Sequence, residues 1–311
     1  MKYWIGVTDN SWFRFLAERE PDEVNFWRPG GKAAFRAIQP GSPFLFKLHS
    51  PENFIAGGGF FVRHTVLPLS LAWEAFGDKN GAGTFDAFRT SITRRRKQSG
   101  DLDPSIGCTI LAEPFFFERT DWIPAPSNWR PSIQQGKTYD TEEPVGRAIM
   151  EQVLERLPRY QHDRDPAKLP MPTPEPPGLY GSEYLTRARL GQGAFRVLVT
   201  DAYERRCAIT GERTLPVLQA AHIKPFAESG PNRVDNGLLL RSDLHILFDR
   251  GFLTIDKDHR VEVSRRIREE YENGRDYYAL RGKQLQVVPA NYAERPSPDF
   301  VAWHNEEIFK G

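Results

Sequence analysis

Three short segments in the last third of the chain decide the fold of that region, and they read Gln219-Ala-Ala-His222-Ile-Lys-Pro225, Asp235-Asn236-Gly237-Leu-Leu-Leu240 and Asp243-Leu-His245-Ile-Leu-Phe-Asp249. The first is a predicted strand that ends at His222, so the imidazole can point into the following loop rather than into the core. Asn236 follows fourteen residues later in a predicted turn. The third lies on a helix predicted over residues 242–250, and the three segments therefore predict a strand, a loop and a helix.

His245 and Asp249 are four residues apart on the predicted helix and are therefore neighbours on one of its faces. An imidazole and a carboxylate in this arrangement can share one divalent cation. A neutral imidazole opposite them, such as that of His222, can take a proton from water. These are the parts of a metal-assisted phosphodiester hydrolase. A single histidine is more often structural, so the prediction depends on the whole set.

The same residues resemble the HNH motif of ββα-metal nucleases. The resemblance extends over most of residues 185–309 and includes Arg189-Leu-Gly-Gln192, Phe195-Arg196, Cys207-Ala-Ile-Thr-Gly211, Ala221-His-Ile, Asn236-Gly-Leu and Leu244-His-Ile-Leu-Phe-Asp249. It implies that His222 is the general base and that Asn236 holds the loop of His222. It also implies that His245, with Asp249, binds one Mg²⁺-like ion that stabilises the phosphate and the leaving 3′ oxygen.

Two departures from the family pattern concern metals. Many HNH sites have a ligand directly before the general base, where this chain has Ala221, so the third metal ligand stays open. Mg²⁺ is the expected ion, and Mn²⁺, Co²⁺ and Ni²⁺ are alternatives. Many relatives also carry a four-cysteine zinc site, but Cys207 has no cysteine partner at Thr210 or Gly211, so we expect no structural zinc.

Other polar and charged residues lie in or near the motif, and more than one role is open for several of them. Lys224 and Arg241 are candidate phosphate clamps, and the alternative for both is a solvated surface role. Asp249 could instead cap the helix or pair with Arg250. His259 and His304 lie outside the motif, and we expect both at the surface.

The domain organisation is predicted from the position of the prolines. A chain of 311 residues is about twice the usual domain size. Seven of its prolines fall in the 21 positions from Pro158 to Gly178, which predicts a semi-rigid spacer. The predicted parts are a domain at 1–157, a linker at 158–180 and a domain at 181–311. The alternative is a proline-rich loop within one domain.

The N-terminal part alternates short apolar runs with turns, which predicts a small twisted barrel. We expect strands at 3–7, 43–48, 59–63, 106–111 and 115–117, and a helix at 85–96. In the C-terminal part we expect helices at 184–206, 242–250 and 263–271, and strands at 207–210, 217–220 and 252–255. The predicted fold class is therefore α+β.

The N-terminus resembles the EVE branch of PUA-like domains, through Lys2-Tyr-Trp-Ile5, Thr8-Asp9-Asn10-Ser11-Trp12-Phe13 and the Pro40-Gly41 turn before Phe44-Leu-Phe-Lys47. Such domains read a modified base by accepting a flipped nucleotide between aromatic rings, and stacking offsets part of the cost of extrusion. The candidate base-binding residues are Asn10, Trp12, Asn25, Phe26, Trp27 and Trp73. The alternative is that the tryptophans fill the core. The candidate phosphate contacts are Arg94, Arg95, Arg96 and Lys97, which could also be a solvated helix end.

A base reader joined to an HNH nuclease predicts a modification-dependent, type IV-like restriction endonuclease. Its expected substrate is double-stranded DNA with 5-methylcytosine or 5-hydroxymethylcytosine, cut at a distance from the modified base. One HNH site cuts one strand, so a double-strand break needs two subunits, for example a homodimer, or two binding events. The alternatives are an HNH endonuclease of unmodified DNA and a catalytically silent binding module for nucleic acid, including RNA.

The composition of the chain limits how it can bind nucleic acid and where we expect it in the cell. The 42 basic and 41 acidic residues leave a net charge of +1, so nucleic acid would be met by local patches. No run of eighteen apolar residues occurs, and we expect neither a membrane span nor secretion. Two cysteines suit a reducing compartment, and the expected location is cytoplasmic.

Overall fold

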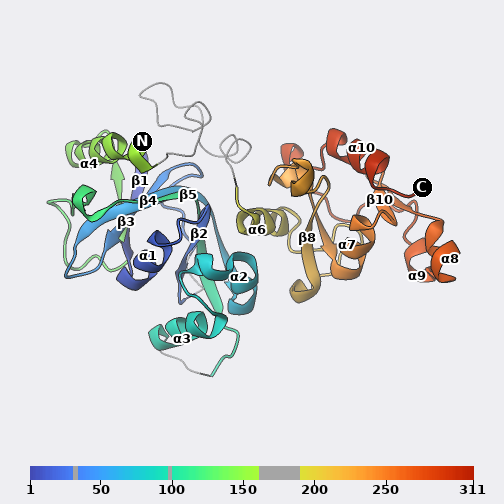
Figure 1. Ribbon diagram of the computed structural model, residues 1–311, viewed down its shortest axis with the longest axis horizontal. Coiled ribbons are helices and arrows are strands. Elements are labelled where there is room, and N and C mark those ends of the chain that lie inside the picture. The colour runs from blue at the N-terminus through green and yellow to red at the C-terminus, as the bar shows by residue number, and fades with distance from the viewer. Residues whose placement is uncertain (31–33, 97–99, 161–189) are drawn as a thin grey trace. The chain divides into compact units, whose positions relative to one another are not determined.

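The computed structural model describes residues 1–30, 34–96, 100–160 and 190–311, and divides into two compact units at 1–194 and 195–311. Both units combine helices with β-sheet (Figure 1), which confirms the α+β class. The predicted linker lies outside the described residues except for 158–160, and the predicted domain boundaries remain predictions. Within the described residues, no helix is long and apolar enough to cross a membrane.

The N-terminal unit is built on one seven-stranded sheet. Its strands are β1 (Lys2–Thr8), β2 (Glu23–Arg28), β3 (Pro43–Leu48), β4 (Phe54–Pro68), β5 (Ser105–Phe116), β6 (Ile123–Pro124) and β7 (Gly136–Asp140). The order is β2-β5-β4-β3-β1-β7, with β6 paired to β4. β1 and β3 are parallel and the other ladders of this sheet are antiparallel. No ladder joins β2 to β7 among the described residues.

Continuous apolar runs explain the central strands. All six residues of β3 are buried, as expected for a strand covered on both faces. β4 starts earlier and ends later than the predicted strand at 59–63, and its three glycines allow close approach of β5. A Cβ atom on Gly57 would lie 2.3 Å from the Phe115 carbonyl oxygen. The two strands predicted at 106–111 and 115–117 are one strand, β5, with register irregularities in its pairing to β4.

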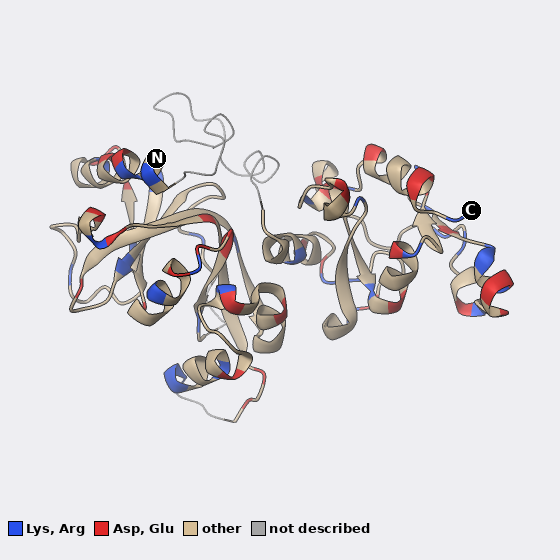
Figure 2. Cartoon of the chain, viewed as in Figure 1, with Lys and Arg blue, Asp and Glu red and all other residues tan. Residues whose placement is uncertain are grey.

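Among the described residues of this unit, four helices accompany the sheet, and they are α1 (Asn10–Ala17), α2 (Leu69–Phe76), α3 (Phe85–Arg95) and α4 (Pro144–Arg156). The carboxylate of Asp9 caps α1 by accepting from the Ser11 and Trp12 amides. Thr84 caps α3 in the same way. Basic and acidic side chains are spread over both units, with basic residues at the end of α3 (Figure 2).

The C-terminal unit consists of short elements. Its strands are β8 (Leu218–His222), β9 (Gly237–Arg241), β10 (Leu253–Ile255) and β11 (Val261–Val263). The helices in this part of the chain are α6 (Gln192–Ala202), α7 (Ser242–Asp249), α8 (Arg266–Tyr271), α9 (Arg275–Tyr278) and α10 (Pro298–Glu307). The strand predicted at 207–210 is wrong. This segment is a turn, closed by a hydrogen bond from the Gly211 amide to the Cys207 carbonyl at 2.9 Å, with Gly211 at φ +70°.

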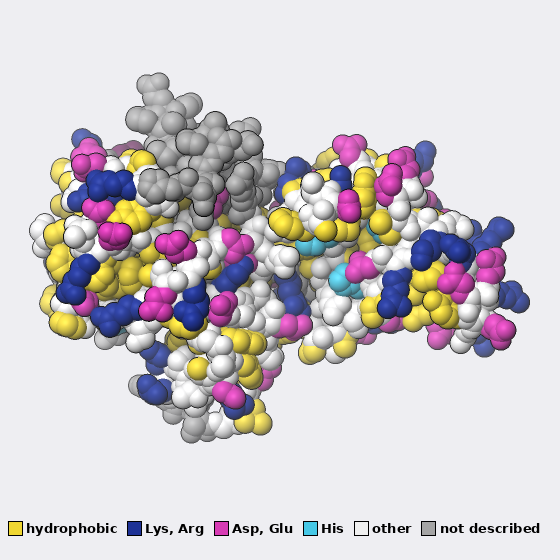
Figure 3. Space-filling view, in the orientation of Figure 1, with side chains coloured by type: hydrophobic (Ala, Val, Ile, Leu, Met, Phe, Trp, Pro, Cys, Tyr) yellow, Lys and Arg dark blue, Asp and Glu magenta, His cyan; other side chains and the backbone are white. Residues whose placement is uncertain are grey.

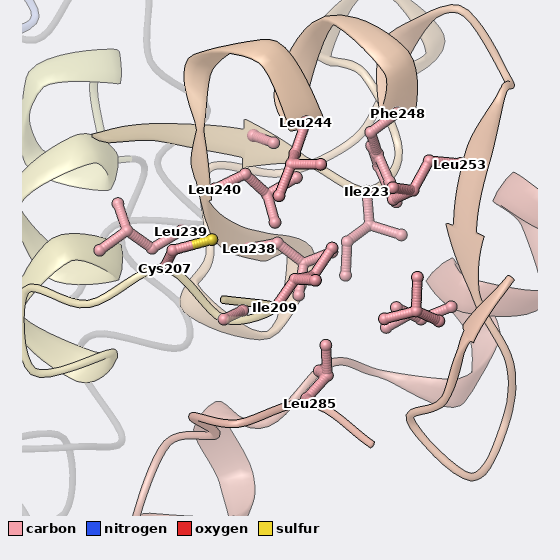
Figure 4. Close-up of a cluster of buried hydrophobic side chains, with 14 of the residues drawn as sticks. Cys207, Ile209, Ile223, Leu238, Leu239, Leu240, Leu244, Phe248, Leu253 and Leu285 are labelled. Carbon is pink, nitrogen blue, oxygen red and sulfur yellow. The ribbon is translucent and has the colours of Figure 1, made fainter. Parts of the chain in front are cut away.

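The core of this unit explains how α7 is oriented. Leu244 and Phe248 are four residues apart, are almost fully buried, and point into a cluster with Leu238 and Leu240 of β9 (Figure 4). Because successive helical residues are about 100° apart, His245 and Asp249 must then lie beside this apolar stripe, at the rim of the core.

His304 lies inside the core, so the prediction of a surface position is wrong. Only 2% of it is exposed, and its ring stacks on Phe248 with 3.8 Å between centroids. Nε2 donates to the Phe248 carbonyl oxygen at 3.2 Å, and Nδ1 accepts from the Thr254 hydroxyl at 2.9 Å. Burial lowers the pKa of His304 to about 4.

This pKa predicts a pH dependence of stability. An unfolded histidine has a pKa near 6.5, so between about pH 6.5 and 4 the unfolded chain binds the extra proton and folding loses stability as pH falls. The contribution of His304 is fully present above about pH 6.5, and its upper bound is about 3 kcal/mol. We expect His304→Gln to flatten the pH dependence of the unfolding free energy in this window, measured by urea denaturation. Parallel curves for both proteins would contradict the assignment.

Candidate active site and base-binding pocket

The β8–β9 hairpin and α7 bring together the residues that the sequence places in three separate segments. β8 pairs with β9 so that His222 lies opposite Gly237, and α7 starts directly after β9. His222 is therefore at the end of its strand, as predicted. It is close enough to His245 and Asp249 for their charges to act on its pKa. Histidine side chains reach the surface of this unit, one of them beside an acidic side chain (Figure 3).

His222 is held by a hydrogen bond and a ring contact. Its Nε2 is 2.8 Å from Oδ1 of Asn232, and its ring stacks on Phe195 with 3.9 Å between centroids. Because an amide oxygen only accepts, Nε2 carries the proton and Nδ1 keeps its lone pair. Burial lowers the pKa of His222, and the hydrogen bond to Asn232 opposes this effect. The ring is thus a neutral base near pH 7.

Asn236 ties together the two ends of the loop that follows His222. It is fully buried, and its amide nitrogen donates to the carbonyl oxygens of Lys224 at 2.9 Å and Pro231 at 3.0 Å. Its Oδ1 accepts from the Lys224 amide at 2.9 Å, and its own carbonyl accepts from the Ile223 amide. These contacts suit the positioning role that the family resemblance implies for Asn236.

His245 and Asp249 form a donor set that suits a cation. His245 Nδ1 lies 2.8 Å from Oε1 of Gln219, which only accepts, so the proton is on Nδ1 and the lone pair on Nε2. Nε2 in turn lies 3.2 Å from Oδ2 of Asp249. Burial lowers the pKa of His245, which favours the neutral ring. Two ligands at right angles around an ion at ~2.1 Å are ~3 Å apart, so both atoms fit neighbouring positions on one Mg²⁺-like ion.

The protein supplies few further ligands. In the described parts of the chain, no group of three or more His, Cys, Asp or Glu side chains could hold a metal. Ala221 is fully buried and offers no donor. Asp249 has 57% of its side chain exposed and His245 has 22%, so solvent or a phosphate can reach an ion held by this pair. A divalent ion bound there would supply positive charge to a scissile phosphate.

Gln219 has no charged group to offer a metal ion, but we expect it to affect metal binding through its contact with His245. Its acceptor fixes the tautomer of His245, and such partners of metal ligands are worth about 10- to 100-fold in metal affinity. We expect Gln219→Leu to raise the Mn²⁺ concentration needed for half-maximal cleavage by about this factor. The check is a Mn²⁺ titration of DNA cleavage. An unchanged midpoint would show that Gln219 does not orient the ligand.

The two candidate phosphate clamps are differently placed. Arg241 makes a bidentate ion pair with Asp243, at 2.7 and 2.8 Å, so its guanidinium is already engaged. Lys224 has its ammonium 5.3 Å from the centroid of the Trp303 ring. Lys224 lies two residues after His222, and its backbone is fixed by Asn236. Of the two, Lys224 is the one still available to a phosphate.

The N-terminal unit holds a pocket of about 470 Å³. Three of the predicted base-binding residues, Trp12, Phe26 and Trp27, line it, together with Val7, Asp9, Arg28, Pro29, Gly30, His49, Arg95, Gln134 and Gln135. Trp27 is half-buried, and Arg95 lies 5.5 Å above its ring. Trp12 is 6% exposed and makes edge contacts with Phe26 and Phe46, so it also belongs to the core. A pocket of this size suits a small aromatic ligand.

The other predicted base-binding residues do not line this pocket. Asn25 is fully buried and donates to Oδ1 of Asn80 at 2.8 Å, so its amide serves the interior. Trp73 packs against Phe85 and Phe88. Asn10 accepts from the His49 amide at 2.8 Å and so fixes a residue of the pocket wall rather than forming the wall itself.

The basic residues at the end of α3 differ in their positions and contacts. Arg94 is exposed. Arg95 pairs with Asp9 at 2.5 Å and lines the pocket. Arg96 donates to the carbonyl oxygens of Pro29 and Ser105. Lys97 lies outside the described residues.

The sequence alone assigned no individual role to several residues that contribute to these sites. They are Gln219, Asn232 and Phe195 around the histidines, and Arg28, His49, Gln134 and Gln135 around the pocket. Their roles depend on contacts between segments that are separate in the sequence.

Residues 207–256 match the family of HNH endonucleases. This part of the chain is therefore an HNH endonuclease domain, and it contains His222, Asn236, His245 and Asp249. The enzyme class that it defines is a DNA endonuclease.

Several solved structures are similar to the chain at low identity, and three of them follow. ASCH from Zymomonas mobilis is 9% identical, with 48% of this chain and 94% of that protein covered and a TM-score of 0.34. The modification dependent TagI restriction endonuclease is 15% identical, with coverages of 93% and 76% and a TM-score of 0.30. The type IV phosphorothioation-dependent restriction endonuclease ScoMcrA is 12% identical, with 78% and 48% covered and a TM-score of 0.21. No curated protein matches the chain.

Proposed function

We propose that this chain is a modification-dependent restriction endonuclease that cuts double-stranded DNA containing 5-methylcytosine or 5-hydroxymethylcytosine. The HNH domain at 207–256 supplies the cleavage site. The pocket at Trp12, Phe26 and Trp27 supplies the reader of the modified base. The observation on which the cleavage half depends is the neutral His222 ring beside the His245–Asp249 pair.

His222 acts as the general base in this proposal. Its free Nδ1 accepts a proton from the attacking water, while Asn232 holds the opposite edge of the ring through Nε2. Phe195 prevents the ring from tilting, and Asn236 keeps the following loop in place. A positioned base of this kind contributes about 10²- to 10⁴-fold to the rate. His245 and Asp249 would hold the divalent ion, with Mg²⁺ expected and Mn²⁺, Co²⁺ or Ni²⁺ as alternatives.

The N-terminal pocket acts on an extruded base. A methyl group on a stacked cytosine is hard to inspect within the duplex, so the base must leave the stack at a cost of a few kcal/mol. Stacking on Trp27 offsets about 1–3 kcal/mol of this cost. Arg28 and the two glutamines of the wall offer polar groups to the edge of the base. Two copies of the chain, acting together or in sequence, would complete a double-strand break.

The test is digestion of two plasmids of identical sequence, one with modified cytosine and one without, in Mg²⁺ and in Mn²⁺. We expect cutting of the modified plasmid and little cutting of the unmodified one. Equal cutting of both would show an endonuclease that does not read the modification. Binding without cutting of either would indicate a silent nucleic-acid-binding module.

A further inference from the structure

A second pocket, of about 760 Å³, adjoins the first in the N-terminal unit. The two pockets share Val7, His49 and Gln134 in their walls. The second pocket is also lined by Lys47, Asn53 and Trp129, none of which the function proposed above uses. The wall of this second pocket includes Lys47 on β3, a lysine that is almost fully buried.

The ammonium group of Lys47 is buried, and few neighbouring groups stabilise its positive charge. It is 5% exposed, and its ammonium donates to Oδ1 of Asn53 at 2.7 Å. The ring of Trp129 lies 5.5 Å away and adds a weak attraction. Within the described ranges, no carboxylate lies within 4.0 Å of the ammonium. Burial lowers the pKa of Lys47. An ammonium has three donors, so two remain for a ligand.

Burying a charge without a counter-ion is costly, and most buried lysines are paired. The cost is reduced when an anion enters the pocket and supplies the missing charge. A phosphate group fits this requirement, because its oxygens accept from an ammonium in a charge-assisted hydrogen bond. The neighbouring pocket already provides aromatic walls for a base, so a phosphate at Lys47 would lie next to a bound nucleotide.

We propose that the pocket around Lys47 and Asn53 binds a backbone phosphate of the DNA strand whose base occupies the adjoining pocket. This assignment rests on the reader function proposed above. It makes Lys47 a residue that fixes the register of the strand, because a phosphate contact positions the nucleic acid while the base contact provides specificity.

Binding is measured by fluorescence anisotropy with the full chain carrying His222→Ala, so that the DNA is not cut. We expect Lys47→Met to weaken binding of the modified duplex by about 10-fold or more. The slope of log affinity against log salt should fall by about 0.9, the value for one lost phosphate contact. Lys2→Met removes the same charge from an exposed position and should change both quantities much less.

A series of duplexes with one neutral methylphosphonate each locates the phosphate. At one position, the methylphosphonate should weaken binding of the duplex to the parent protein but should not weaken binding to Lys47→Met any further. The proposal is wrong if the Lys47→Met variant binds the modified duplex as tightly as the parent protein. It is also wrong if each methylphosphonate weakens binding of Lys47→Met as much as it weakens binding of the parent. Asn53→Asp is a second variant that keeps the lysine but places a carboxylate beside it. It should weaken binding similarly while raising the melting temperature.

Inorganic phosphate and an unmodified duplex serve as two further probes of the same pocket. If inorganic phosphate raises the melting temperature of the parent but not of Lys47→Met, and DNA affinity is the same in both, the site takes free phosphate and the assignment to the strand is overturned. If the parent binds modified and unmodified duplexes equally, the reader function fails. The methylphosphonate result still decides the role of Lys47 in that case, because it does not depend on the modification.

Discussion

His222→Ala is expected to reduce the single-turnover rate of strand cleavage by about 10²- to 10⁴-fold, with DNA affinity nearly unchanged. The variant removes Nδ1, the lone pair that accepts the proton of water, and leaves the His245–Asp249 pair in place. The measurement is cleavage of an end-labelled duplex with enzyme in excess, so that product release does not limit the rate.

The matched control is His259→Asn. His259 lies in a turn with φ +59°, a backbone conformation that asparagine adopts readily, and it is outside the active site. This variant should cleave at the rate of the parent. A His222→Ala protein that cleaves as fast as His259→Asn would mean that another group activates the water, and the general-base assignment would have to be withdrawn.

Trp27→Leu is expected to weaken binding of modified DNA by about 10- to 100-fold, the loss of one stacking partner for an extruded base. The indole is half-buried in the pocket wall and is fixed by a hydrogen bond from its Nε1 to the Asn80 carbonyl oxygen at 2.8 Å. Binding of unmodified DNA should change little, because that duplex keeps its bases stacked. The measurement is anisotropy with both duplexes.

Trp73→Leu is the control for this experiment. Trp73 is equally half-buried and packs on Phe88, as Trp27 does, but it does not line the pocket. Both substitutions remove an indole of the same unit, so a general loss of stability should affect both. Equal losses of binding in the two variants would therefore mean that Trp27 acts through folding and not by stacking.

The elements that the sequence predicts best are those whose local pattern and tertiary environment agree. The helix at 242–250 is observed as α7 because Leu244 and Phe248 are buried at helical spacing. The strand at 43–48 is observed as β3. The segment 207–210 reads as a strand because it is apolar, but Gly211 at positive φ closes it into a turn. His304 is buried because α10 packs on β10 and α7, an arrangement that no local pattern encodes.

The spacing of His222, His245 and Asp249 is enough to predict that these side chains come together, since a strand end and one helix face set their positions. The partners that orient them could not be predicted. Gln219 reaches His245 across the β8–α7 contact, and Asn232 reaches His222 through a loop whose path depends on Asn236. Asn25 does not reach the pocket, because its amide nitrogen donates to Asn80 and Cys108 in the interior.

The central claim is that the His222, His245 and Asp249 side chains form a metal-dependent phosphodiesterase site. The most direct measurement is nicking of a supercoiled plasmid with modified cytosine by the purified 311-residue chain, with the divalent ion controlled. We expect nicking in Mg²⁺ or Mn²⁺, its loss on chelation with EDTA, and its return when the ion is added back. Nicking at the same rate in EDTA, or none in Mg²⁺, Mn²⁺, Co²⁺ or Ni²⁺, would contradict the claim.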